Sequence, residues 1–111
     1  MLQKYIEILT RDEAIFHKKP DGTEVNYFLF PEFEIHINSL PGKTVQGWHK
    51  HHEIEEVLLV QSGKVKIEEV ENQQIVSRIC AEGELIRMHN SLHRISNPDT
   101  LSASFTVFRF V

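Results

Sequence analysis

The sequence of 111 residues is poor in the residues that mark several protein classes. Cys80 is its only cysteine, so no disulfide forms within one chain and a metal site built from several cysteines is excluded. There are only five glycines and four prolines, and 41% of the residues are hydrophobic, which argues against a disordered or low-complexity chain. We expect one domain over residues 1–111, because two separate cores would need a longer chain.

Long apolar runs and clusters of positive charge are also missing. Runs such as Val57–Val60 are far shorter than the roughly 20 residues of a membrane-spanning helix. The stretch MLQKYIEILTRDE has no apolar core of the kind found in signal peptides. The formal net charge is −4, with lysines and arginines scattered along the chain, which gives no electrostatic footprint for nucleic acid. We therefore expect a cytoplasmic protein that binds neither nucleic acid nor membrane.

The sequence does contain many short segments rich in valine, isoleucine and phenylalanine. Turn-forming residues separate these segments, and no apolar stripe of helical period is longer than about two turns. Many short strands at regular spacing are typical of a β-sandwich or a small β-barrel, so the expected fold class is all-β. The expected strands are 5–9, 25–30, 33–38, 45–51, 56–61, 65–70, 75–80, 85–88, 93–96 and 102–110.

A helical interpretation competes with this one around HEIEEVLLV, because glutamate favours helices. A zinc-protease helix would need a second histidine four residues after His52, but Glu56 stands there. His89 and His93 also have helical spacing, although Asn90 between them favours a turn. We prefer strands in both places.

Several histidines gather in and after the expected strand 45–51. Strand alternation places His49 and His51 on one face, about 7 Å apart along the backbone. A tight turn would then bring Glu56 opposite this pair, and a later strand could add His93. Three imidazoles and one carboxylate suit one divalent transition metal ion, Zn, Fe, Mn or Ni, without choosing among them.

The order and spacing of these residues follow a known pattern. His49 and His51 are followed after four residues by Glu56 and after six more by Gly63, with Gly42 upstream. This arrangement resembles the first motif of the cupin superfamily, in which a glycine forms the turn out of the strand. Glu55 is an alternative carboxylate, but Glu56 has the spacing to Gly63 that the motif shows.

A second motif occurs in the stretch GELIRMHNSLHRISN. It begins at Gly83 and reaches His93 after an alternating strand and a turn, and Asn97 follows after three more residues. This stretch resembles the second cupin motif. It departs from that motif where Met88 and Asn90 replace proline and glycine, and the distance from Gly83 to His93 is one residue shorter. With their flanking strands, the two motifs cover most of the chain.

The resemblance implies a fold and a range of functions. The implied fold is a cupin-type double-stranded β-helix, a single-domain jelly-roll barrel of the RmlC-like kind. The implied function is that of a metal-dependent enzyme of dioxygenase, isomerase or epimerase, or lyase type, acting on a small polar metabolite in the barrel. The alternative is a non-catalytic cupin that binds or senses a metabolite. The implied metal ligands are His49, His51, Glu56 and His93.

Further residues are candidates for the pocket or for an interface. Glu34 and His36 share one face of FEIHIN and are candidates for proton transfer if that face is interior, while the reverse assignment places them on the surface. Arg87 and Arg109 could hold a substrate carboxylate from within the barrel, although exposed strand arginines are the preferred interpretation.

The resemblance to small cupins also implies a homodimer in which the apolar outer faces of one sheet meet. Val57 and Leu59 are apolar on the side opposite Glu56, and a sheet that is apolar on both faces needs a covering layer. We therefore expect a homodimer.

Overall fold

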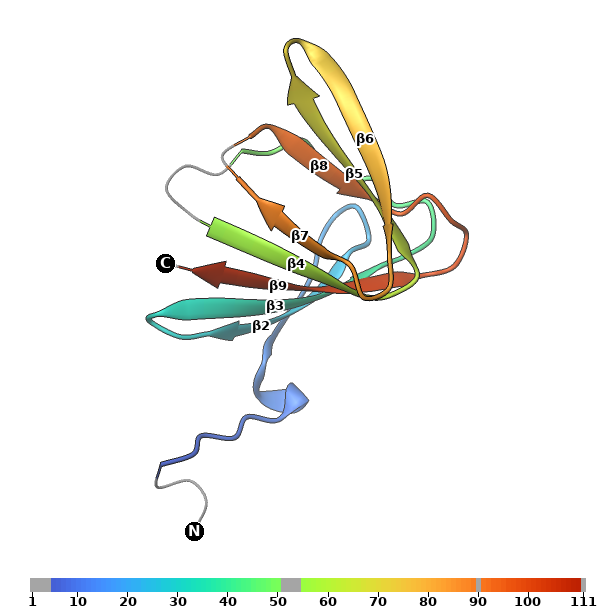
Figure 1. The fold of residues 1–111 in the computed structure, drawn as a ribbon. Helices are drawn as coiled ribbons and strands as arrows, with labels where there is room; N and C mark the ends of the chain where they lie inside the picture. The colour runs from blue at the N-terminus through green and yellow to red at the C-terminus, as the bar shows by residue number, and fades with distance from the viewer. Residues whose placement is uncertain (1–4, 51–54, 90, 111) are drawn as a thin grey trace.

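The computed structural model describes residues 5–50, 55–89 and 91–110, whose regular secondary structure consists of β-strands apart from one short 3-10 helix (Figure 1). The expected all-β class is confirmed. Within these ranges no helix has the length and apolar character needed to cross a membrane. The elements are the 3-10 helix η2 (Arg11–Glu13) and the strands β1 (Ile15–Lys18), β2 (Glu24–Leu29), β3 (Phe33–Leu40), β4 (Glu55–Ser62), β5 (Lys64–Glu71), β6 (Gln74–Ala81), β7 (Leu85–Met88), β8 (His93–Ser96) and β9 (Ala103–Phe110).

The strands form two antiparallel sheets that face each other (Figure 1). The larger sheet has the strand order β1-β2-β3-β9-β4-β7, and the smaller sheet has the order β6-β5-β8. Consecutive strands pair in β1-β2-β3 and β5-β6, but other neighbours are distant in the sequence: β9 pairs with both β3 and β4, and β8 pairs with β5. This is the connectivity of a jelly roll, because each sheet collects strands from both halves of the chain.

The hydrophobic core lies between the two sheets. Alternate residues of β4 and β9 point into it, so Leu58, Val60 and Phe105 are almost fully buried, whereas Val57 and Leu59 on the other face of β4 are half-buried. Val65 and Ile95 complete the packing from the smaller sheet. Each such aliphatic side chain contributes about 1.5–3 kcal/mol when it leaves water, which is what holds the two sheets together.

Most expected strands coincide with observed ones. Eight of the expected strands correspond to β2 through β9, with ends that differ by two residues at most. These eight are 25–30, 33–38, 56–61, 65–70, 75–80, 85–88, 93–96 and 102–110. The expected strand 5–9 is wrong, because these residues form no strand and are exposed. The strand β1 was not expected, since all four of its side chains are exposed and give no alternating pattern.

The expected strand 45–51 is also wrong as a regular strand in the part that is described. Val45 pairs with Ser96 and His49 pairs with His93, as isolated bridges alongside β8. Four steps along one chain segment therefore face only three along the other, so one extra residue is inserted between the bridges. A β-bulge of this kind interrupts the ladder and turns the bulged segment, and Gly47 lies within it.

Candidate functional site

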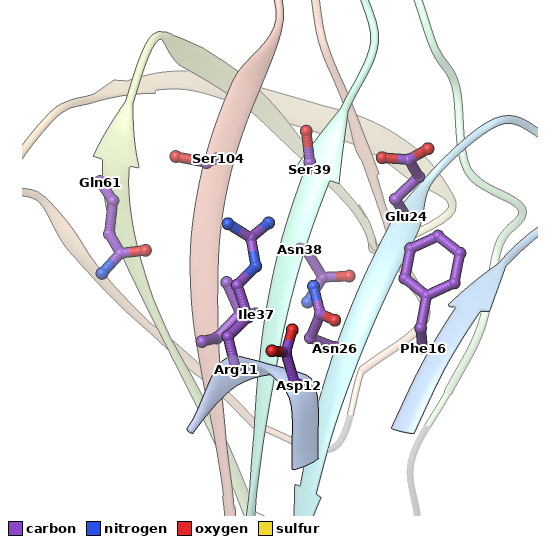
Figure 2. Close-up of a pocket in the computed structure, with 10 residues that line it drawn as sticks. All are labelled: Arg11, Asp12, Phe16, Glu24, Asn26, Ile37, Asn38, Ser39, Gln61 and Ser104. Atoms are coloured by element: carbon purple, nitrogen blue, oxygen red, sulfur yellow. The ribbon is translucent and has the colours of Figure 1, made fainter. Parts of the chain in front are cut away.

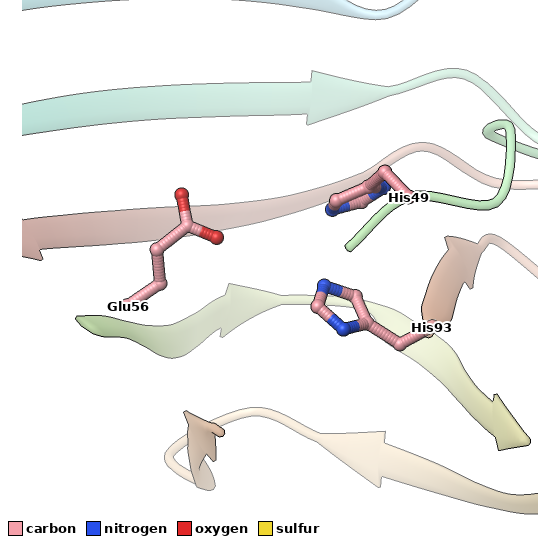
Figure 3. A group of neighbouring side chains, drawn as sticks. All are labelled: His49, Glu56 and His93. Atoms are coloured by element: carbon pink, nitrogen blue, oxygen red, sulfur yellow. The ribbon is translucent and has the colours of Figure 1, made fainter. Parts of the chain in front are cut away.

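Two histidines and a glutamate come together between the sheets (Figure 3). His49 lies in the bulged stretch beside β8, Glu56 is in β4 and His93 is in β8. One ligand atom from each side chain lies within 4.8 Å of the other two. Glu56 and His93 are buried and His49 is half-buried. Three sequence-predicted residues, from segments up to 44 positions apart, thus converge on one point.

Backbone pairing fixes the two histidines relative to each other. The amide of His49 donates to the carbonyl of His93 at 2.9 Å, and the amide of His93 donates to the carbonyl of His49 at 2.9 Å. Directly opposed residues of an antiparallel pair project to the same side. The two rings consequently meet edge to face, with centroids 4.4 Å apart and planes inclined at 74°.

The other ring nitrogen of each histidine is held by the backbone. Nδ1 of His93 donates to the carbonyl of Ser91 at 2.9 Å, and Nδ1 of His49 donates to the carbonyl of Gly47 at 3.3 Å. A carbonyl only accepts, so these bonds place the proton of a neutral ring on Nδ1 and leave the lone pair on Nε2. This is the arrangement of metal-binding histidines, whose second nitrogen is anchored to a carbonyl or carboxylate.

Glu56, and not Glu55, faces the two histidines. Glu56 is only 8% exposed, whereas Glu55 is exposed and forms an ion pair with Arg87. Strand alternation separates the two side chains onto opposite faces of β4. His51, the fourth expected ligand, lies outside the described residues.

Glu34 and His36 also point toward the interior. Oε1 of Glu34 lies 2.8 Å from Nε2 of His36, and the His36 ring packs edge-on against Tyr27 with centroids 4.6 Å apart. Arg109, next to Glu34 and Glu56 in the register of the sheet, brings Nη1 to 3.7 Å from Glu34 Oε1 and Nε to 3.8 Å from Glu56 Oε2. A row of charged groups therefore crosses β3, β9 and β4 beside the histidines.

A cavity of about 490 Å³ opens beside these groups. Its polar wall includes Tyr27, His36, His49, Glu56 and Arg109, and its apolar wall is made of core side chains from β2, β4, β8 and β9. A cavity of this size with a few convergent polar groups is typical of a small-molecule site. Burial and the negative charge of Glu34 raise the pKa of Tyr27, so its phenol stays protonated at neutral pH.

Comparison with known proteins places this geometry in a fold family. No protein-family model and no curated protein matches the sequence. Among solved structures, the iron(II) form of HppE matches with a TM-score of 0.82 and 15% identity, over 99% of this chain and 63% of HppE. The CENP-C chain of Drosophila melanogaster, solved bound to CAL1, matches with a TM-score of 0.78 and 16% identity, over 90% of this chain and 82% of that chain. The cupin domain of Cnp3 from Schizosaccharomyces pombe matches with a TM-score of 0.74 and 8% identity, over 92% and 72% of the two chains.

The chain has the cupin fold. The expected jelly-roll barrel is thereby confirmed, and at these identities the likeness extends to the fold alone. Its structure neighbours include both the iron protein HppE and CENP-C, which binds another protein.

The glycines and the asparagine of the two motifs maintain the cupin barrel. Gly63, in the turn between β4 and β5, has φ +72°, and a Cβ there would come within 3.0 Å of Ala103. A Cβ on Gly42 would lie 2.1 Å from the carbonyl oxygen of Thr100. The buried Asn97 side chain donates to the carbonyls of Leu40 and Leu101 at 3.1 and 2.8 Å. These motif residues hold loops together and do not reach the histidine cluster.

One arginine lies where the sequence analysis did not expect it. Arg87 is exposed as expected, but Arg109 lines the cupin cavity, and the preferred exposed position for it is wrong. Tyr27 and Lys19, which also line the cavity, were not identified. Alternation from the buried Val25 could have placed Tyr27 inside, whereas nothing in the sequence places Lys19 there.

A second group supports the stretch that carries His49. The guanidinium of Arg94 lies 4.6 Å from the centroid of the Trp48 ring and donates from Nε to Oε1 of Glu68 at 2.8 Å. This hydrogen bond from Arg94 lowers the pKa of the buried Glu68 carboxyl. Since Trp48 precedes His49, the contact anchors the bulged segment to β5 and β8 of the cupin barrel.

A separate cavity of about 510 Å³ lies on the opposite face of the larger sheet (Figure 2). Arg11 and Asp12 of η2 cover it, and its floor includes Asn26, Ile37 and Ser104, which alternate with inward-facing residues of their strands. None of its described lining residues is a histidine or a cysteine. Among the described residues, the group of side chains that could hold a metal ion lies in the interior of the cupin barrel.

Proposed function

We propose that this chain is a single-domain cupin enzyme that uses one divalent transition metal ion to act on a small polar metabolite in the interior cavity. One observation carries the proposal: the ligand atoms of His49, Glu56 and His93 lie within 4.8 Å of one another. His51, two residues after His49, is the proposed fourth ligand. In His49 and His93, Nδ1 is hydrogen-bonded to a backbone carbonyl. This supports a metal site, because the basic Nε2 atoms then point away from the backbone.

The residues present fit such an ion. Imidazole and carboxylate ligands suit Zn, Fe, Mn or Ni, and metal–ligand distances near 2.1 Å keep ligand atoms within about 4.2 Å of one another. Neighbouring ligand atoms of a tetrahedral or octahedral ion are about 3.0–3.4 Å apart, so the three side chains, whose ligand atoms lie within 4.8 Å, would approach one another by up to about 2 Å to close on an ion. When bound, the ion supplies Lewis-acid chemistry, which stabilises negative charge that develops on a substrate oxygen.

Glu34, His36 and Glu56 are the proposed catalytic residues of the protein itself. The hydrogen bond between Glu34 Oε1 and His36 Nε2 keeps a proton on Nε2 and leaves Nδ1 as the basic nitrogen of a neutral ring. His36 lines the cavity, so this pair can accept a proton from a substrate and hold the resulting positive charge against the Glu34 carboxylate. Glu56 would act beside it, both as a metal ligand and as a proton acceptor.

The same proposal includes a cytoplasmic homodimer. Phe28, Ile35, Phe108 and Val57 form a continuous apolar row across β2, β3, β9 and β4, on the face opposite Glu56. All four are half-buried in the single chain. A second copy would remove this row from water. The lone buried Cys80, whose pKa is raised by burial, is compatible with a reducing compartment.

Metal content and turnover test the proposal in sequence. Purified protein should contain close to one equivalent of a transition metal, or take it up on reconstitution, and His51→Ala should lose it while the barrel stays folded. Less than about a tenth of an equivalent in the unmodified protein after reconstitution would refute the metal site. Unchanged occupancy in His51→Ala would refute the assignment of that ligand.

Turnover of a panel of keto acids, sugars and catechols then separates an enzyme from a metabolite-binding module. Conversion that disappears on chelation and returns with metal supports the enzyme. Tight binding of a panel compound without any conversion would favour the binding or sensor alternative.

A further inference from the structure

We propose that the cavity selects a small carboxylate anion, with Arg109 as the residue that recognises it. This inference rests on the proposed function, because it names the class of ligand for that same cavity. It concerns a side chain that belongs neither to the histidine cluster nor to the Glu34–His36 pair. The argument begins with the hydrogen bonds of Arg109.

Arg109 has a donor that the described part of the protein does not satisfy. Its Nε–H is buried and has no hydrogen-bond partner within the described residues. The adjacent carboxylates are too distant, with Nε 3.8 Å from Glu56 Oε2 and Nη1 3.7 Å from Glu34 Oε1. Buried donors are nearly always satisfied, and a charged one is costly to leave unmet. Because the side chain of Arg109 lines the cavity, a small rotation of its guanidinium would bring this donor to an acceptor on a ligand.

The other polar groups around the cavity favour an anion. Tyr27 stays protonated, since burial and then Glu34 raise its pKa, and it adds a hydroxyl donor to the wall. The charged side chains in the lining are Lys19, Glu56 and Arg109, and Glu34 lies 3.7 Å from Arg109, so two positive charges face two negative ones. A divalent ion at the histidine cluster would make the site positive overall. Negative charge in such a site is stabilised more strongly than in water, because the surroundings are less polar.

The neighbours of Arg109 narrow the anion to a carboxylate. A guanidinium binds a planar carboxylate through two parallel hydrogen bonds. Glu34 and Glu56 flank Arg109 at less than 4 Å, so a second negative charge on the ligand group would be repelled. A carboxylate group can form the two parallel hydrogen bonds and carries a single charge. A phosphate dianion can form the hydrogen bonds, but it carries the second charge that Glu34 and Glu56 would repel.

Calorimetric titration with matched probes tests this inference. Succinate and benzoate would be compared with their neutral isosteres, succinamide and benzamide, and with inorganic phosphate. Each probe would be titrated into zinc-loaded protein and into protein stripped with chelator, with zinc content measured on the same samples. We expect each acid to bind about tenfold or more tightly than its amide, because the amide carries no charge and replaces one of the two acceptor oxygens with a donor NH2 group.

Two arginine variants assign the effect to one side chain. Arg109→Gln should lower the affinity for the acids by about tenfold or more and leave the amides little changed. Arg87→Gln is the matched control, because Arg87 is an exposed arginine of β7 in the same sheet and pairs with Glu55. Arg109→Lys, which keeps the charge but loses the paired donors, should retain part of the preference. Thermal melting of each variant verifies that the barrel is folded.

The outcomes separate this inference from the proposed function. Equal affinity for acids and amides in the zinc-loaded protein, no binding of any probe, or tighter binding of phosphate would each overturn the carboxylate assignment while leaving the metal site intact. Equal losses in Arg109→Gln and Arg87→Gln would overturn the role of Arg109. An acid preference that depends on Arg109 in protein unable to bind any metal would support the inference and refute the metal-dependent function.

Discussion

His93 is the residue on which the candidate site depends most. It is 1% exposed, its backbone is paired to His49 and its Nδ1 is anchored on Ser91. We predict that His93→Ala weakens zinc affinity by more than about 100-fold, because loss of a ligand should exceed the 10–100-fold cost of losing an outer hydrogen bond. Competition with a chromophoric chelator would measure the change.

His89 provides the control for this substitution. It is an exposed histidine directly after β7 and four residues before His93, and it is not part of the His49–Glu56–His93 cluster. His89→Ala should bind zinc like the unmodified protein. Equal zinc affinity in the two variants, with both folded, would place the metal elsewhere.

The Glu68–Arg94 ion pair makes the stability of the folded barrel depend on pH. The hydrogen bond from Arg94 lowers the folded-state pKa of Glu68, so this pair stabilises the fold above the ordinary glutamate pKa of about 4.3 and loses that effect as the pH falls through the lowered value. We predict that Glu68→Gln melts several degrees lower at pH 7, and that the difference narrows below about pH 4. Thermal melts across this pH range measure it.

Glu71→Gln is the matched substitution for Glu68→Gln. Glu71 ends the same strand β5 and is exposed, and its removal should leave the melting temperature nearly constant at every pH. A gap between Glu68→Gln and the unmodified protein that stays constant from neutral to acidic pH would show that packing, and not the ion pair, is responsible.

Part of the site could be predicted at this scale and part could not. Glu56 was preferred over Glu55 from spacing and strand parity, and the structure turns Glu56 inward. Arg109 has the same alternation available, but the choice of face depends on its pairing with Glu34 and Glu56 from other strands. Such register is a property of the folded sheet, because it is set by contacts between segments far apart in the sequence.

At the scale of elements, the turn between β4 and β5 requires a glycine for two reasons. Gly63 has φ +72°, and a Cβ there would come within 3.0 Å of Ala103, whereas Gly83 has φ +87° with no atom within 4 Å of its Cβ position. Gly83→Ala should therefore cost about 1 kcal/mol of folding free energy, for the backbone conformation alone. Gly63→Ala should cost at least about 1 kcal/mol more, because β9 must also shift. Urea denaturation of both variants measures the difference.

The comparison between the two glycines would fail in a definite way. Equal losses of unfolding free energy in Gly63→Ala and Gly83→Ala would mean that the close contact between a Cβ at position 63 and Ala103 of β9 does not destabilise the fold. The cupin spacing of Gly63 would then reflect backbone conformation alone.

The sequence predicts the strands from β2 to β9 well because their alternation and their turn residues agree locally. It fails at 45–49, where the inserted residue is visible only through the pairing of Val45 with Ser96 and of His49 with His93. A bulge depends on the partner strand, so local periodicity cannot reveal it. The 5–9 segment fails for a related reason: its apolar residues suit a strand, but no described neighbour pairs with them.

At the scale of the whole molecule, the apolar outer face of the larger sheet predicts the oligomeric state. Phe28, Ile35, Phe108 and Val57 are register neighbours, so the row spans four strands without a polar interruption. Rows of this kind on an exposed sheet are stabilised by a covering partner. The outer cavity under η2 lies on this same face, lined partly by Ile37, so the surface is shaped as well as apolar.

Light scattering after gel filtration tests the homodimer. The unmodified protein should have twice the chain mass of 13.0 kDa. Val57→Asp should shift it to the single-chain mass, because a carboxylate within the row would be buried without a partner charge. Val76 is an exposed valine of β6 outside the row, so the Val76→Asp variant should remain a dimer.

The ligand cavity lies on the opposite face of the sheet from the row. The Val57→Asp variant should therefore keep its metal. A mass of 13.0 kDa for the unmodified protein would refute the dimer. A Val76→Asp variant that dissociates as much as Val57→Asp would show that this face is not the dimer interface.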